Sequence, residues 1–431
     1  MTQCYSRTLV LSAALLLAAH GASAQLVLST EIRPRAELRN GFRTVRTPGD
    51  DPAFFVEQRS RLNVDYTREK LQIRLSVQDV RIWGSTSQIY KSDPNLFNVF
   101  EAYGEYQLSR HWAVRAGRQA LDYDNARFLG ALDWAQQGRS HDAIKLMYAG
   151  STGFAAHVGA AFNQSFVPEP NKLFNTFYPT SDKGGVDNYK SMQYLWLHKD
   201  WTGAKVSALL FNDGRQRADS SAYYRQTYGV IGEKKAGPLL VGGEFYYQAG
   251  TDGARRPVKA YLASVNLTLP TKLTPLTLGA DYLSGADAND TRNRAFAPLY
   301  GTNHAFYGHM DYFYVGNGHG QKGNVTGLVD LYLKANFKLG TRSSLLAHLH
   351  HFESPVAVFK LTDMKQELGS RLGEELDLVF NQNVSPEFNF KLGYSHLLAS
   401  SSLDALKGRN GQMNNQWAWA MLTFKPVLFK N

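Results

Sequence analysis

Cysteine is almost absent from this chain of 431 residues, whose only thiol is Cys4. Residues 1–24 combine a basic start, a short apolar run and small residues at Ala22 and Ala24, which is the pattern of a cleavable secretory signal peptide. We therefore predict cleavage after Ala24, so that Cys4 leaves with the signal peptide. The mature chain, residues 25–431, would then have no disulfide, no cysteine nucleophile and no cysteine-ligated metal site.

Long hydrophobic runs are also missing, because no later stretch approaches the roughly 20 apolar residues of a membrane-spanning helix. A role in a membrane would therefore have to be that of a β-barrel. The sequence has no internal repeat of the kind that builds propellers or solenoids, and no linker that would divide it. These absences predict a single domain over residues 25–431.

Motifs of known chemistry are lacking as well, since there is no G-x-S-x-G, no metalloprotease helix and no P-loop. Ser395 and His396 are adjacent on a predicted strand, so their side chains point to opposite faces and cannot form a dyad. His348 and His350 share one strand face, but no third histidine or carboxylate lies at ligand spacing, which favours a rim of histidines. The turn at Asp287–Asp290 lacks the glycine and terminal glutamate of a calcium loop, which favours a solvated turn. The sequence thus predicts no enzyme, no cofactor and no metal.

What the sequence does contain is strict alternation of apolar and polar residues. Val329, Leu331 and Leu333 occupy every second position of one stretch, with Asp330 and Lys334 among the polar residues between them. This period is that of a β-strand, because successive side chains leave opposite faces of the pleat. One face is apolar and the other charged, as in a membrane barrel that turns its apolar face to lipid and its polar face to a water-filled lumen.

The same pattern recurs along the whole chain and predicts eighteen strands. The predicted strands are Leu26–Leu38, Phe54–Tyr66, Leu71–Ile82, Phe97–Leu108, His111–Leu121, His141–Ala149, Phe154–Phe162, Tyr189–Lys199, Ala204–Asn212, Ala222–Gly232, Pro238–Gln248, Val258–Leu269, Pro275–Ser284, Val325–Leu339, Ser343–Phe352, Leu372–Asn383, Glu387–Ala399 and Gln416–Lys425.

The connections between these strands alternate in length from end to end. Links such as Ser109-Arg110 and Gly340-Thr341 are short, whereas those at Asp122–Ser140 and Gly285–Asn324 are long. Short periplasmic turns and long extracellular loops alternate in this way on an even-stranded outer-membrane barrel. The 23 Tyr and 24 Phe suit the aromatic girdles of such a barrel. We therefore predict an all-β fold, a transmembrane antiparallel β-barrel of about 18 strands in the bacterial outer membrane.

Assigning the apolar residues to lipid predicts which side chains line the lumen. Two interpretations apply to them, a network of salt bridges or a track of arginines that binds anions in bidentate fashion, and the two are compatible. The predicted lumenal residues from alternation are Arg33, Arg35, Arg59, Arg61, Arg74, Arg81, Glu101 and Lys334.

The charge balance gives a further indication about partners. Lys and Arg number 47 against 37 Asp and Glu, an excess that favours anionic partners such as acidic polysaccharide, lipopolysaccharide or phosphate groups. The charges are spread along strands rather than clustered, and a secreted chain does not meet nucleic acid, so we predict no nucleic-acid partner.

Several segments, in the same order along the chain, resemble the alginate-export family of outer-membrane barrels. The segments that carry the resemblance are Asp79–Gly84, Ala116–Tyr123, Arg127–Gly130 with Trp134, Arg139–Ala143, Phe296–His304 with Gly308 and Asp311, and Leu372–Leu378. The resemblance implies an eighteen-stranded barrel with an electropositive constriction through which a polyuronate passes. It also implies that Arg118, Arg127 and Arg139, with Arg81 beside them, line the constriction or anchor its loops. Two departures are the short mature chain and a C-terminus that does not end on an aromatic residue.

Together these observations predict a passive outer-membrane channel for an anionic solute, most plausibly an acidic polysaccharide or oligosaccharide that diffuses along lumenal Arg and Lys. The alternatives are a nutrient-uptake or general anion-selective porin, and a structural or adhesive barrel whose long loops do the work. The expected partners are outer-membrane lipid and lipopolysaccharide, the anionic saccharide, and periplasmic secretion partners if the direction is export.

Overall fold

A computed structural model describes residues 24–85, 97–164, 188–217, 219–313, 318–409, 411 and 414–431. Residues 1–23 lie outside this part, so the signal peptide stays a prediction. Most of the long loop predicted at Asn163–Asn188 and of the one before Phe97 also lie outside the described residues.

The described chain forms an antiparallel barrel of 18 strands, which confirms the predicted fold class. The barrel strands are β1 Gln25–Asn40, β2 Ala53–Arg68, β3 Leu71–Ile82, β4 Phe97–Gln107, β5 Trp112–Gln119, β6 His141–Ala149, β7 Phe154–Phe162, β8 Ser191–Trp201, β9 Ala204–Gln216, β10 Ala222–Ala236, β11 Leu239–Thr251, β12 Pro257–Leu269, β13 Leu276–Leu283, β16 Leu328–Lys338, β17 Ser343–Glu353, β20 Arg371–Asn383, β21 Phe388–Ala399 and β22 Asn415–Phe424.

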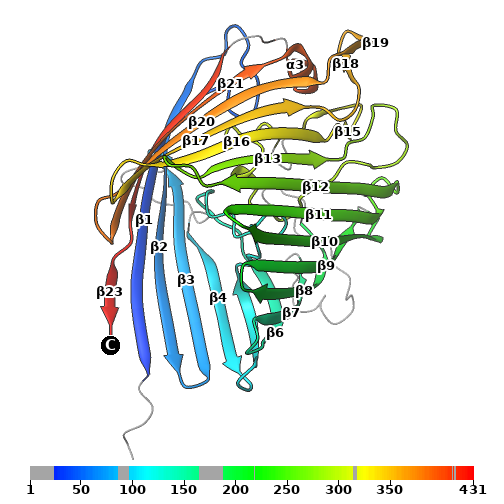
Figure 1. Cartoon of the computed structure of the whole chain (residues 1–431). Coiled ribbons are helices and arrows are strands. Elements are labelled where there is room, and N and C mark those ends of the chain that lie inside the picture. Colours follow the sequence, from blue (N-terminus) through cyan, green and yellow to red (C-terminus); the bar gives the residue numbers. More distant parts are fainter. Residues whose placement is uncertain are drawn as a thin grey trace, which may run out of the picture.

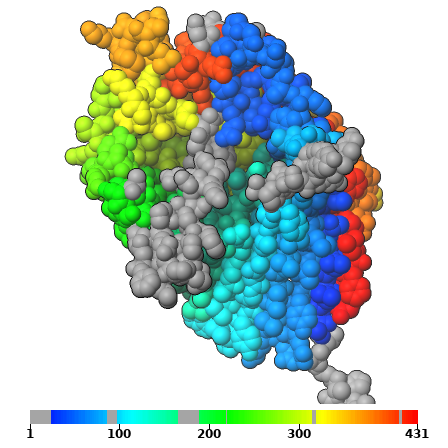
Figure 2. Space-filling model, turned by 180° about the vertical axis from the view of Figure 1, so that it is seen from behind, coloured from blue at the N-terminus to red at the C-terminus, as the bar shows by residue number. Residues whose placement is uncertain are grey.

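Each barrel strand pairs with the next along the chain, and the ring closes where β22 pairs with β1 (Figure 1). In the register of this closing pair, Glu37 lies opposite Trp419 and Arg35 opposite Met421. In Figure 2 the first strands, in blue, run directly beside the red C-terminal strand. A closed ring leaves no unpaired strand edge, which is what a bilayer requires, because it offers no partner for backbone N–H and C=O groups.

Burial follows the predicted alternation. On β12 and β13 the outward Val265 and Leu278 are 55% and 46% exposed, whereas the inward Ser264 and Asp281 are buried. Exposed apolar side chains on one face and buried polar ones on the other would be unfavourable in water, but the arrangement is stable when lipid covers the outside. The short turns follow from local chemistry too, since Gly203 adopts a φ of +77°, which glycine reaches without strain.

The long connections contain the remaining elements. These are the 3-10 helix η1 Asn303–Ala305, the hairpin β14 Gly320–Gln321 with β15 Asn324–Val325, the hairpin β18 Val358–Lys360 with β19 Asp363–Leu368, and the short helix α3 Ser401–Leu406. A last strand, β23 Val427–Lys430, follows β22 and pairs with the start of β1. No helix in the described part of the chain is long and apolar enough to cross a membrane.

The apolar core of the molecule lies inside the ring rather than between sheets. Two connections return into the lumen between the barrel walls. They are residues 120–140, here called the first inward loop, and the described residues 284–313 with 318–327, here called the second inward loop. Phe128 and Leu129 of the first loop and Tyr307 and Met310 of the second are almost fully buried. Two connections predicted as external loops therefore narrow the channel from within.

Candidate functional site

The first inward loop is fastened to the β8–β9 wall just after it leaves β5. The Tyr123 hydroxyl lies 3.0 Å from that of Tyr194, and the Trp196 Nε1–H donates to Asp124 Oδ2 over 2.9 Å. The aromatic rings of Tyr123 and Trp196 are in contact at 5.0 Å. The loop is thus held by aromatic packing as well as by hydrogen bonds.

Arg127 then anchors the loop to the β11–β13 wall. Its guanidinium donates to Glu244 over 2.6 Å, to Asp281 over 2.8 Å and to the Tyr307 hydroxyl over 2.9 Å, and the side chain is only 3% exposed. Burial alone would lower the pKa of Arg127, but Asp281 and Glu244 outweigh it and raise the pKa well above its usual value. The two carboxylates therefore neutralise the charge of Arg127. The contacts named here direct its guanidinium to the wall and to Tyr307, and none of them points into the open lumen.

The arginines of β1 and β2 hold the far end of the same loop. Arg33 and Arg35 donate to the Trp134 carbonyl oxygen, over 3.4 and 2.8 Å, and the Arg35 guanidinium also lies 4.2 Å above the Trp134 ring. Arg59 and Arg61 donate to the carbonyl oxygens of Gln136 and Gln137. Their acidic partners are Glu31, Glu37, Glu57 and Asp133. These four buried guanidiniums are loop anchors rather than a free track.

Asp133 is the loop carboxylate that these arginines share. It lies 2.9 Å from Arg59 and 3.4 Å from Arg33, yet its side chain is 60% exposed to the lumen. Burial would raise the pKa of Asp133, but the charges of Arg59 and Arg33 outweigh this effect and lower it. The carboxylate therefore stays ionised and compensates the cationic wall.

The second inward loop packs across the first. The Gly130 N–H donates to the Tyr300 carbonyl over 2.9 Å, and the Thr302 N–H donates to the Ala126 carbonyl over 2.8 Å. The ring of His304 stacks on that of Trp134 at 4.4 Å. The two loops thus form one layer inside the barrel.

The other predicted lumenal residues have separate surroundings. Arg74 bridges Asp65 and Glu101 over 2.8 and 2.7 Å, and the second oxygen of Glu101 accepts from the Ala120 N–H. Arg139 donates to the Gly130 and Gly301 carbonyl oxygens and so joins the two loops. Lys334 is half-buried on the inner face of β16.

Two predicted positions are wrong, because strand alternation directs them outward. Arg118 follows Val114 and Ala116 on the outer face of β5, is exposed, and pairs with Asp142 of β6 over 2.7 Å. Arg81 lies on the same outer face of β3 as Leu75, whereas Gln78 is buried on the inner face. On the outer face the Arg81 Nε donates to Asp79 over 2.6 Å. Only the family resemblance predicts a lumenal Arg118, whereas the strand period of β5 places it with the apolar residues.

Two lumenal lysines were missed and differ from the arginines. Lys145 on β6 shares the inner face with His141, and Lys391 on β21 shares it with Ser395. Among the described residues, neither they nor Lys334 has a carboxylate within 4.0 Å of its ammonium. The alternation of β6 and β21 places both lysines on the inner face, so this signal was present in the sequence.

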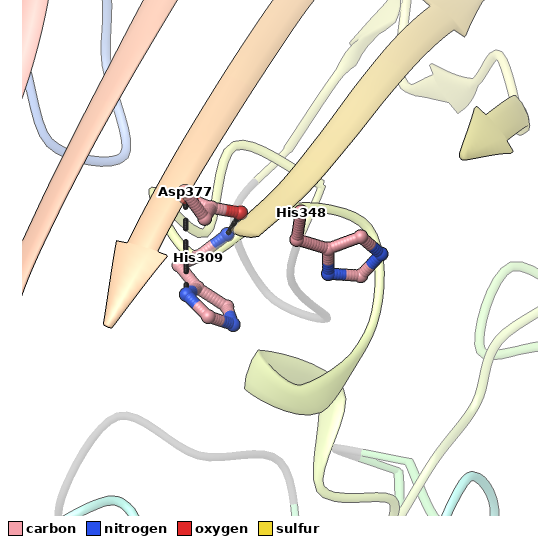
Figure 3. A group of neighbouring side chains, drawn as sticks. All are labelled: His309, His348 and Asp377. Carbon is pink, nitrogen blue, oxygen red and sulfur yellow. Dashed lines mark hydrogen bonds and ion pairs between the residues drawn. The ribbon is translucent and has the colours of Figure 1, made fainter. Parts of the chain in front are cut away.

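Two histidines and one aspartate meet where the second inward loop contacts β17 and β20 (Figure 3). His309 from the loop, His348 from β17 and Asp377 from β20 place one ligand atom each within 4.8 Å of the others. The sequence spacing around His348 and His350 gave no sign of this grouping, because the partners of His348 come from distant segments. His351, in contrast, points outward and contacts Glu353 and Glu374. Burial lowers the pKa of His309 to about 4, so this imidazole is neutral at pH 7.

Two other predicted arrangements can be placed. Ser395 is buried and donates to Asp377, whereas His396 lies on the opposite face of β21, as predicted. In the Asp287–Asp290 turn, the carboxylates accept from backbone N–H groups of the turn itself.

A polar cavity of about 240 Å³ lies beside the first inward loop. Asp124, Trp196, His198, Lys205 and Glu244 are among the residues that line it. Its lining combines both signs of charge with an aromatic ring, which suits a polar solute.

A closed barrel with an apolar outer wall and a charged lumen narrowed by inward loops is the architecture of an outer-membrane channel of bacteria. The comparisons agree with this class. The sequence matches the model of the family described as "Alginate export" over residues 24–418, so the chain belongs to the alginate export family. A search of the curated proteins found no match.

Solved structures with the same fold are outer-membrane proteins of low sequence identity. Pseudomonas aeruginosa OccK9 (OpdG) is 12% identical with a TM-score of 0.62, covering 94% of this chain and 98% of its own. Acinetobacter baumannii OccAB4 is 10% identical with a TM-score of 0.60, covering 94% of this chain and 98% of its own. Pseudomonas aeruginosa OpdK, solved with vanillate, is 9% identical with a TM-score of 0.58, covering 93% and 98%.

Proposed function

We propose that this chain is a passive outer-membrane channel for anionic solutes, and that an acidic oligosaccharide or polysaccharide is its substrate class. The observation that carries the proposal is the set of Lys145, Lys334 and Lys391, three lumenal ammonium groups without an ion pair among the described residues. An unpaired cation in a pore wall attracts anions and still releases them, which conduction requires. Membership of the alginate export family supports the saccharide.

In this proposal the lysines replace the arginines as the contact points, with Lys334 and Lys391 half-buried and Lys145 8% exposed. Buried guanidiniums already bonded to carboxylates and carbonyls cannot turn to a solute without leaving those partners unsatisfied, which costs several kcal/mol. Lysine carries its charge on a flexible stem and forms point contacts. The arginines hold the constriction in place, and the lysines contact the anion.

The inward loops limit the size of what passes. Because both loops pack across the lumen, a saccharide would pass as a single extended chain or as short fragments. No catalytic step is part of the proposal, since Ser395 bonds to Asp377 and lies on the face opposite His396.

A second candidate is uptake of small carboxylates. The structure of OpdK with vanillate, an aromatic carboxylate, and the polar cavity beside Trp196 favour it. A structural or adhesive barrel would show no conductance at all.

Single-channel recording in planar bilayers tests the proposal. Replacing Lys145, Lys334 and Lys391 together by glutamine should lower the anion-to-cation permeability ratio about two- to fivefold, since a charge about 4 Å away in water contributes on the order of 1 kcal/mol. Polyuronate should block the wild-type current, and block by small carboxylates alone would favour the second candidate.

The matched control is Arg118→Gln, which removes one cation from the outer face. It should leave the permeability ratio unchanged. An unaltered ratio in the triple variant would remove the lysines from the conduction path, and a silent wild-type barrel would contradict transport altogether.

A further inference from the structure

Three segments far apart in the sequence meet around one point of the lumenal wall. His309 belongs to the second inward loop, His348 to β17 and Asp377 to β20, and Figure 3 shows the three side chains together at the inner side of these strands. His348 lies opposite Asp377 in the strand register. The cluster thus joins a loop to two adjacent strands of the barrel.

The carboxylate of Asp377 is held in place but not saturated. It accepts from the Ser395 Oγ–H over 2.5 Å and from the His309 backbone N–H over 3.2 Å. The Glu375 side chain is also hydrogen-bonded to Asp377, and since an ionised carboxylate has about four acceptor positions, about one remains for another partner. The His309 Nδ1 atom is 3.8 Å from Asp377 Oδ1, which is too long for a hydrogen bond.

His350 adds a fourth donor beside these three. Its Nδ1 lies 2.9 Å from both oxygens of the Asp330 carboxylate, and its Nε2 is 3.7 Å from Asp377 Oδ2. The rings of His348 and His350 are 3.8 Å apart. A carboxylate on one imidazole nitrogen orients the other toward a metal in many protein metal sites.

Two nitrogens of the cluster are buried and have no hydrogen-bond partner in the part of the chain that the structure describes. These are His348 Nε2 and His350 Nε2, on residues that are 5% and 1% exposed. An unsatisfied buried polar atom costs about 1–3 kcal/mol. A cluster held by hydrogen bonds alone would leave both atoms unpaired, whereas a cation between them would satisfy them.

We propose that His309, His348 and Asp377, with His350 as the fourth donor, bind one divalent transition-metal ion of the zinc type. Imidazole nitrogen and carboxylate oxygen are the donors that zinc takes in tetrahedral sites, while calcium and magnesium require mainly oxygen ligands. Zinc ligands at about 2.0–2.1 Å from the metal stand roughly 3.4 Å apart, so donors that lie within 4.8 Å of one another have to close by up to about 1.4 Å. His309 is on a loop and is the donor best able to move.

Metal binding would fasten the second inward loop to the barrel wall. Gly308, with a φ of +83°, brings the loop backbone against the Glu375 carboxylate, and the Met310 N–H donates to that residue over 2.7 Å. A bound metal would add bonds between the loop and strands β17 and β20 next to these contacts. The inference goes beyond the proposed channel function and holds whichever solute passes.

Metal titration of the refolded full-length barrel tests the proposal. Zinc, competed against a chromophoric chelator, should bind with a stoichiometry of one, and cobalt should give the visible absorption of a tetrahedral site. His348→Ala and His309→Ala should each weaken zinc binding at least tenfold, because each removes a ligand.

His351→Ala is the matched control, since it removes the neighbouring histidine on the outer face and should leave zinc affinity unchanged. Heat-modifiable migration on gels and circular dichroism show which variants have folded. His309→Ala changes only a loop residue and leaves the strands of the barrel wall unaltered. Failure of the wild type to bind zinc, or zinc binding by both ligand variants equal to that of the wild type, would overturn the metal site without affecting the conductance test.

Discussion

At the scale of residues, arginine and lysine have different tasks in this lumen. Arg33, Arg35 and Arg59 are each less than 5% exposed and contact loop carbonyls and carboxylates. The planar guanidinium suits such buried, multiply bonded positions, because its five donors can all be satisfied. Lys145 and Lys391 lie on the inner face of the barrel without such partners among the described residues.

Asp133→Asn should loosen the first inward loop. The substitution removes the carboxylate that Arg59, Arg33 and Arg61 share, and leaves these cations facing one another. More frequent gating events in single-channel recordings are the expected result.

Acidification should have the same effect in the wild type. The pKa of Asp133 is lowered from 3.8 when the loop is docked, so docking is fully favoured above pH 3.8 and weakens as the pH falls through the docked value. The added gating as the pH falls below about 3.8 should be missing in Asp133→Asn. An equal pH response in both proteins would assign the effect to other groups.

At the scale of elements, the first inward loop is the part that narrows the lumen together with the second inward loop. Its middle is fixed by Arg127 and its far end by the arginines of β1 and β2. These anchors come from opposite walls, so the loop is held at both sides of the lumen. Breaking one anchor should affect the loop before it affects the barrel.

Arg127→Met should cost about 3–5 kcal/mol of stability, because it leaves Glu244 and Asp281 buried without their counter-charge. The urea midpoint of the refolded protein measures this loss. Arg255→Met, which breaks an exposed pair with Asp219, should cost at most about 1 kcal/mol. A similar midpoint for both variants would show that the Arg127 network does not stabilise the fold.

At the scale of the whole molecule, the medium decides which face of each strand can be apolar. The ring exposes Val265, Leu278 and Val158 on its outside and buries charged groups within. The same surface in water would aggregate, while in a bilayer it is the favourable contact.

Val265→Arg should destabilise the barrel by about 2–4 kcal/mol in lipid vesicles, since it places a charge on the lipid face near the middle of β12. The neighbouring substitution Asn266→Arg places an arginine side chain in the polar cavity near Glu244 instead, and should be tolerated. Equal folding free energies of the two variants in vesicles would contradict the assigned faces.

The sequence alone determined the strands, their order and most of their facing. Alternation is a local property with a period of two, and it placed all eighteen barrel strands and the inward direction of Arg33, Arg59 and Glu101. Of the residues placed by the family resemblance, Arg127 and Arg139 hold the inward loops, whereas Arg118 lies on the outer face.

Only the tertiary structure decided what happens inside the ring. The path of a long loop depends on partners from distant strands, such as Glu244 and Asp281 for Arg127, and no local period encodes such contacts. For the same reason the spacing of His348 and His350 gave no sign of His309 and Asp377. A sequence pattern fixes which side of a wall a residue occupies, whereas the closure of the ring fixes which residues it meets across the lumen.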